Sequence, residues 1–213
     1  MGEGKEAGGQ RIEGRIPQRV LDTIFRWATC RTILILWGAF VAFNLLVMSP
    51  AYRRIETFSG GVGAIDFLIV YRPEKVYDMI AAYGQTGRRF YATIALTLDT
   101  IFPLLMALTF GLTLARVYPR GFSREGVLHR ALLVPVAAMT ADLLENTAIA
   151  TMLLSYPDRV RAVALLASSC STVKWTAVGA EVLLLIIGLA AWLVRALRGE
   201  RLDRGDHFEG RQG

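Results

Sequence analysis

The sequence predicts an all-α integral membrane protein: an up-down four-helix bundle with an extracytoplasmic amphipathic helix between the first and second membrane spans. Of its 213 residues, 54% are hydrophobic and only 20% are charged. The apolar residues gather into four runs, each near the roughly 20 residues that cross a bilayer core. Short connections after the second and third runs favour antiparallel neighbours. This pattern excludes an ordinary soluble domain.

Residues 1–30 are predicted to form a cytoplasmic tail and an interfacial helix. Within 17–27, Val20, Ile24 and Phe25 recur at helical spacing, and Trp27 suits the headgroup boundary. The first span follows at 31–49. Because a long polar and basic stretch precedes this run and no small-residue cleavage site follows it closely, we expect the run to stay in the membrane.

The connection 50–89 carries the predicted extracytoplasmic helix. Pro73 suits the first helical position, Glu74 the first turn, and Gly84 the end. Between them an apolar stripe recurs at i, i+3, i+4 and i+7, formed by Val76, Met79, Ile80 and Tyr83. We expect this helix to lie across the outer ends of the spans, as a cover or as a lid.

The remaining spans are predicted at 90–117, 130–156 and 170–194, so that 31–194 is the transmembrane domain. The connection before the last span contains a possible second interfacial helix at 162–167, and a basic cytoplasmic tail covers 195–213. Lys and Arg are denser in the two tails and the second connection than in the other two connections. This bias predicts a multi-pass protein of the inner (plasma) membrane with both termini in the cytoplasm.

The net charge of +6 fits this membrane location. Basic residues beside spans meet anionic lipid headgroups, so the lipid bilayer is the expected partner and nucleic acid need not be invoked. Oligomeric state and protein partners leave no signal in the pattern, because apolar helix faces contact lipid and protein alike.

Several polar and charged residues interrupt the predicted spans. Each charge inside a membrane costs about 2.5–3.5 kcal/mol on insertion scales, so such residues usually face the interior, where they pair or act. The residues are Asn44, Asp99, Asp142, Glu145, Asn146, Lys174 and Glu181. Asp142, Glu145 and Asn146 stand at i, i+3 and i+4, and therefore share one helix face.

These residues predict one outward-facing polar cavity that reaches the bilayer midplane. Arg88 and Tyr91 are placed near its mouth, and all nine residues are candidate ligand contacts. Carboxylates outnumber the single lysine, and unpaired carboxylates do not stay ionised in a low dielectric. The cavity is therefore expected to hold a cation, a proton or the polar part of an amphipathic molecule such as a lipid.

Histidines are absent from these stretches, which excludes haem or His-ligated zinc there. A divalent cation held by oxygen ligands from Asp99, Asp142 and Glu145 is possible. Asp142 and Glu145 are also candidates for an acid/base pair. A Ser171–Lys174 dyad is conceivable, although a serine near a helix start is more often a cap or a surface residue.

Three functions therefore stay open. The first is ligand binding in the cavity. The second is a membrane-embedded hydrolase or transferase acting on a lipid through Asp142 and Glu145. The third is a non-catalytic subunit or assembly factor of a membrane complex, which would have fully paired acidic residues and no cavity.

The segment Tyr83-Gly84-Gln85-Thr86-Gly87-Arg88-Arg89-Phe90-Tyr91 is followed by Asp99, Phe102-Pro103, Asp142-Leu143-Leu144-Glu145-Asn146 and Lys174. With these residues, the stretch 61–192 resembles uncharacterised bacterial four-helix membrane proteins. The resemblance implies the four-helix architecture and carries no activity.

Overall fold

The computed structural model describes residues 17–122 and 125–199, and its regular structure within these ranges is entirely helical. Four helical stretches are long and apolar enough to cross a membrane. They cover Cys30–Phe58, Gly84–Gly121, Arg130–Ser155 and Arg161–Leu197. The predicted tails, 1–16 and 200–213, lie outside the described residues.

The first long stretch is longer than predicted, because it runs through a proline. It contains α2 (Cys30–Phe43), a π-helical turn η1 (Asn44–Met48) and α3 (Ser49–Phe58). Pro50 has no N–H and its ring crowds the carbonyl of Leu46. Just before it the helix widens, and the Ser49 N–H bonds to the Asn44 carbonyl. The helix therefore does not end at Ser49, as the sequence analysis expected, but continues to Phe58.

The chain then turns at glycines and returns toward the helices. Gly60, Gly61 and Gly63 all have positive φ, which other residues rarely adopt. A single 3₁₀ turn, η2 (Ile65–Phe67), follows in the middle of segment 59–72. A helix does begin at Pro73, as α4 (Pro73–Ala82), and α5 (Gly84–Leu96) follows it directly.

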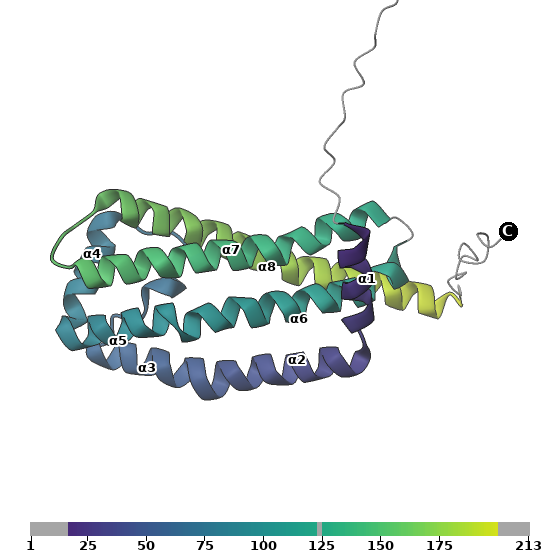
Figure 1. The fold of residues 1–213 in the computed structure, drawn as a ribbon, viewed down its shortest axis with the longest axis horizontal. Helices are drawn as coiled ribbons and strands as arrows, with labels where there is room; N and C mark the ends of the chain where they lie inside the picture. Colours follow the sequence, from purple (N-terminus) through teal and green to yellow (C-terminus); the bar gives the residue numbers. More distant parts are fainter. Residues whose placement is uncertain (1–16, 123–124, 200–213) are drawn as a thin grey trace, which may run out of the picture.

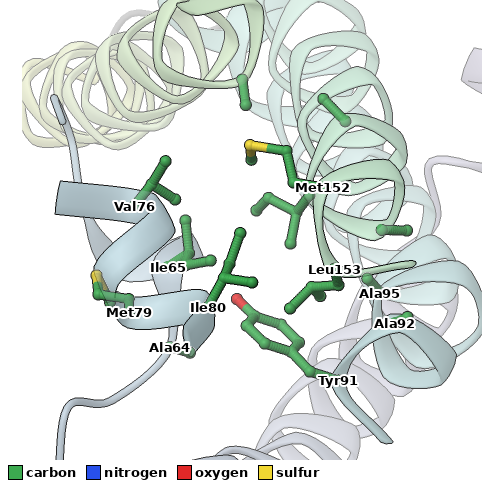
Figure 2. Packing of buried hydrophobic residues seen from close by; sticks show 14 of the residues in the cluster. Ala64, Ile65, Val76, Met79, Ile80, Tyr91, Ala92, Ala95, Met152 and Leu153 are labelled. Carbon is green, nitrogen blue, oxygen red and sulfur yellow. The ribbon is translucent and has the colours of Figure 1, made fainter. Parts of the chain in front are cut away.

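The buried face of α4 packs against α5, α7 (Glu125–Ser155) and α8 (Arg161–Leu197). Val76 and Ile80 point toward Met152 and Leu153 of α7, with Tyr91 of α5 nearby (Figure 2). All five side chains are buried. This apolar cluster holds the segment before α4 close to the helices that carry the polar residues.

The second long stretch bends at Thr97, between α5 and α6 (Leu98–Gly121). The fourth is one helix, α8 (Arg161–Leu197), so the predicted interfacial helix at 162–167 is in fact the first turns of α8. Helices α6, α7 and α8 pack against one another, and α2 lies along α6 (Figure 1). The short helix α1 (Gln18–Trp27) and the C-terminal end of α8 lie at the same end of the molecule (Figure 1).

Candidate functional site

Three carboxylates surround the ammonium of Lys174. Its Nζ lies 2.5 Å from Asp66 Oδ1, 2.7 Å from Glu145 Oε2 and 3.5 Å from Asp142 Oδ1. Asp142 and Glu145 come from one face of α7, as their spacing predicts, and Lys174 faces them from α8. All four residues are buried. We call these four residues the Lys174 cluster.

Asp66 belongs to the segment between α3 and α4 and was not predicted. Its backbone N–H donates to the Tyr91 hydroxyl at 3.2 Å, and its carbonyl accepts from Lys174 at 3.2 Å. The turn η2 thus inserts both the backbone and the carboxylate of Asp66 among the helices. Its sequence signal is weak: a single aspartate interrupts the apolar run 64–71 after the glycine-rich turn.

Tyr52 links Asp66 to Asp99 of α6. Its hydroxyl oxygen lies 2.8 Å from Asp66 Oδ2 and 2.8 Å from Asp99 Oδ1. Tyr52 is on α3, beyond Pro50, and it reaches this position because the first helix continues past the proline. Tyr52 was not predicted as a site residue, because the first span was predicted to end at Ser49.

A proline on α6 explains how Asn146 contacts Asp99. Pro103 lacks the N–H that would bond to the carbonyl four residues earlier, which is that of Asp99. The Asn146 amide donates to that carbonyl at 2.7 Å and to Asp142 Oδ1 at 3.3 Å. A side chain from α7 therefore replaces a missing helical hydrogen bond of α6 and holds the two helices in register.

A cavity of about 620 Å³ opens beside the Lys174 cluster. Its charged lining residues are Asp66, Asp142 and Lys174, together with Arg53 and Glu56 of α3. The rest of the wall is mostly apolar and aromatic, with Phe40, Met48, Phe67, Phe102, Met106, Phe110, Trp175 and Val178. The lining residues come from α2, η1, α3 and segment 59–72, and from α6, α7 and α8.

The structure brings together only part of the predicted set. Asp142, Lys174 and Asn44 line the cavity, whereas Glu145 lies behind it as the third carboxylate on Lys174. Asp99, Asn146 and Tyr91 lie behind it too, in the hydrogen bonds that position the cluster.

Arg88 and Glu181 lie apart from the cluster. The guanidinium of Arg88 stacks 4.2 Å from the Tyr156 ring centroid and donates to the Ile80 carbonyl at 3.5 Å. Glu181 is fully buried, and neither of its carboxylate oxygens has a hydrogen-bond partner among the described residues.

The predicted metal ligands need correction. The oxygens close enough to share an ion belong to Asp66, Asp142 and Glu145, so Asp99 is not one of them. The same three carboxylates surround Lys174 Nζ. An ammonium already supplies the positive charge at this point, and a divalent cation would have to displace it. We therefore assign none of these residues as metal ligands.

The serines near Lys174 are structural in this fold. Ser171 donates to the Leu68 carbonyl, Thr172 donates to the Ile69 carbonyl, and Ser168 accepts from the Tyr71 N–H. These three side chains stand at i, i+3 and i+4 on α8. They anchor segment 59–72 by its backbone, and Ser171 makes no dyad with Lys174.

Two buried tyrosines, Tyr71 in segment 59–72 and Tyr83 at the end of α4, stay neutral. Burial, and next the Glu145 carboxylate, raise the pKa of Tyr71 above its ordinary value. Burial likewise raises the pKa of Tyr83, whose hydroxyl donates to the Gly63 carbonyl at 2.8 Å. Neither phenol therefore supplies an anion near the cluster at neutral pH.

Comparison with known proteins finds no matching family model, curated protein or solved structure. The functional assignment therefore depends on the geometry of the cluster and its cavity.

Proposed function

We propose that this chain is a multi-pass inner-membrane protein, an up-down four-helix bundle with both termini in the cytoplasm and α4 outside. The apolar surface supports membrane insertion. Leu34 is 72% exposed and Leu46 is 75% exposed, and contact of such side chains with water is unfavourable. Helix α1 and the C-terminal end of α8 lie at the same end of the molecule, which supports placing both termini on one side of the membrane. The basic residues near both support the cytoplasmic side.

Within this frame, the cavity is proposed to face outward and to bind an amphipathic molecule. The supporting observation is the mixed lining, which combines Asp66, Asp142 and Lys174 of the Lys174 cluster with mostly aromatic and apolar side chains. A volume of about 620 Å³ is within the usual range for small-molecule sites, about 300–1,000 Å³. A polar headgroup would lie at the cluster, and an alkyl chain along Phe102, Phe110 and Val178.

The other functions have less support. A bound metal would compete with Lys174. An acid/base pair of Asp142 and Glu145 would have both carboxylates engaged by the same ammonium. A purely structural subunit would have no cavity and no unpartnered buried oxygen, but Asp99 Oδ2 and Glu145 Oε1 lack hydrogen-bond partners among the described residues.

Cavity filling tests ligand binding. Val178→Trp on α8 would occupy the apolar wall, whereas Val173→Trp changes an exposed valine of the same helix that does not line the cavity. Each protein is reconstituted in nanodiscs of phosphatidylethanolamine and phosphatidylglycerol and released for native mass spectrometry. We expect wild type and V173W to retain a bound lipid under activation that leaves V178W bare.

Equal lipid retention by V178W and V173W would contradict ligand binding in this cavity. Circular dichroism and gel filtration of both variants provide the folding control. A bare V178W with a wild-type helical spectrum then reports loss of the binding site and not of the fold.

A further inference from the structure

The two hydrogen bonds at the Tyr52 hydroxyl need two hydrogens, and the hydroxyl supplies only one, so a carboxyl group must supply the other. A tyrosine hydroxyl has one hydrogen and can donate to only one acceptor at a time. Its oxygen nevertheless lies 2.8 Å from a carboxyl oxygen of Asp66 and 2.8 Å from one of Asp99. Both distances are those of O–H···O hydrogen bonds. The second bond therefore needs a hydrogen on one of the two carboxyls.

The surroundings indicate which carboxyl holds that hydrogen. Asp66 uses its other oxygen to contact the Lys174 ammonium at 2.5 Å, which favours its anionic form. Asp99 contacts no cation among the described residues, it is 3% exposed, and its Oδ2 has no hydrogen-bond partner. A lone carbonyl oxygen of a neutral acid costs far less to bury than a bare carboxylate oxygen.

We propose that Asp99, Tyr52 and Asp66 form a proton-binding site, in which Asp99 holds the proton and donates through Tyr52 to the Asp66 carboxylate. The chain of donors then runs in one direction, from the Asp99 O–H to the Tyr52 oxygen and from the Tyr52 O–H to Asp66. On release, the Asp99 O–H bond breaks, the proton passes to a water molecule, and a second buried anion remains beside Tyr52.

The proton also determines the net charge of the whole polar region. The groups that face the site are Tyr91 of α5, Asp142 and Glu145 of α7, Lys174 of α8, and Tyr71 in segment 59–72. Lys174 is the one cation among them, and the nearby cavity residues Arg53 and Glu56 of α3 carry opposite charges. Loss of the Asp99 proton adds a negative charge to a region where carboxylates already outnumber cations, and the anions would repel one another in a low dielectric.

Segment 59–72 is the part of the fold that this repulsion would move. Asp66 is held by Tyr52 and Lys174, and the neighbouring residues Gly63, Ala64 and Phe67 line the cavity. Glycines with positive φ at Gly60, Gly61 and Gly63 provide a place to bend. Proton release would therefore loosen the segment and widen the entrance. This gating role rests on the proposed ligand-binding function, but the proton site itself does not.

Infrared spectroscopy tests the proton directly, on full-length protein in phosphatidylethanolamine/phosphatidylglycerol vesicles. A neutral carboxyl gives a C=O stretching band that a carboxylate lacks and that D₂O shifts. We expect this band to be lost in Asp99→Asn and displaced in Tyr52→Phe. Asp158→Asn, which changes an exposed aspartate between α7 and α8, should leave it unchanged. Asparagine can still donate to Tyr52, so D99N is expected to keep the fold.

A D99N spectrum that retains every neutral-carboxyl band of the wild type would overturn the proton site. The gating role is measured separately, as hydrogen exchange of segment 59–72 against pH, corrected with an unstructured peptide of the same sequence. Protection in wild type should fall as the Asp99 band disappears, whereas D99N should keep its protection. If protection is independent of the band, the gating role is wrong.

These results remain separate from the lipid-retention experiment. Loss of the band in D99N would establish the proton site even if V178W retained lipid as V173W does. Conversely, lipid loss in V178W would support the binding cavity even if D99N left the infrared bands unchanged.

Discussion

The contact between Asn146 and the Asp99 carbonyl shows how a proline on α6 gives a hydrogen-bonding role to a residue on α7. Pro103 removes the N–H that would bond to this carbonyl, and the Asn146 amide donates to it at 2.7 Å. A buried carbonyl without a donor costs about 1–3 kcal/mol. Asn146 is therefore expected to contribute to stability through a backbone group that the proline left free.

Asn146→Ala should lower the free energy of unfolding by about 1–3 kcal/mol, because it leaves the Asp99 carbonyl without a donor. In a Pro103→Ala background, the restored backbone N–H can bond to that carbonyl, so the same change should cost less. A double-mutant cycle in detergent measures the difference. Pro119→Ala, elsewhere on α6, is the matched control and should not reduce the cost.

Lys174→Met should be among the most destabilising changes, at about 3–5 kcal/mol, because it leaves buried carboxylates without their cation. Thermal unfolding in detergent provides the measurement. Asp66→Asn in the same chain should recover part of the loss, since it removes one anion. Lys75→Met, at an exposed position of α4, should be nearly neutral. A K174M loss no larger than that of K75M would contradict the ion-pair cluster.

Spacing predicted much of this site, because it depends on helix geometry. Asp142 and Glu145 share a face of α7, and Lys174 faces them from α8. Asp66 and Tyr52 were not predicted. Asp66 enters from a non-helical turn whose direction no periodicity reveals, and Tyr52 lies beyond a proline that usually marks a helix end. Pro103, four residues after Asp99, was a usable signal for a carbonyl in need of a donor.

At the scale of elements, the length of the apolar runs predicted the long helices but not their ends. The first helix passes Pro50 because a π-helical turn precedes the proline and absorbs its effect on the hydrogen bonding. The last helix begins at Arg161 because residues 162–167 continue the helix without a break. In both cases, tertiary packing extends the helix beyond the apolar run from which it was predicted.

Close packing of α6 and α8 depends on Gly188. A Cβ there would lie 2.9 Å from the Tyr118 ring, whereas a Cβ on Gly179 of the same helix would meet nothing within 4 Å. Gly188→Ala should therefore lower the free energy of unfolding by about 1–3 kcal/mol. Gly179→Ala should be neutral or stabilise by up to about 1 kcal/mol, as alanine favours helix. Titration of both variants with sodium dodecyl sulfate compares them, and equal midpoints would contradict the close contact.

The anchoring of segment 59–72 to α8 depends on hydroxyl groups. Ser171→Ala removes the donor to the Leu68 carbonyl, and hydrogen exchange in the segment should become faster. Ser169→Ala on the same helix is the control, because the exposed Ser169 hydroxyl donates within its own helix, to the Leu165 carbonyl. If hydrogen exchange in segment 59–72 were unchanged in S171A, the other contacts of the segment would be sufficient to hold it, and the Ser171 hydroxyl would not be needed.

At the scale of the whole molecule, the proposed orientation in the membrane rests on the basic residues and on the position of α1 and the α8 C-terminus at the same end of the molecule. Cys30 is exposed near α1, and Lys75→Cys places a thiol on α4 at the other end. A membrane-impermeant maleimide should label K75C in intact spheroplasts of a Cys30→Ser variant. It should label Cys30 of wild type only after permeabilisation. The reverse order would invert the topology and place the cavity on the cytoplasmic side.

The central claim is that an amphipathic molecule binds in the cavity with its polar end at the Lys174 cluster. A high-resolution structure in lipid tests it most directly. We predict elongated density along Phe102, Phe110 and Val178, with its polar end beside Asp142 and Lys174. A dry, closed network with every carboxylate paired, and helices packed together where the cavity lies, would contradict ligand binding and indicate a structural subunit.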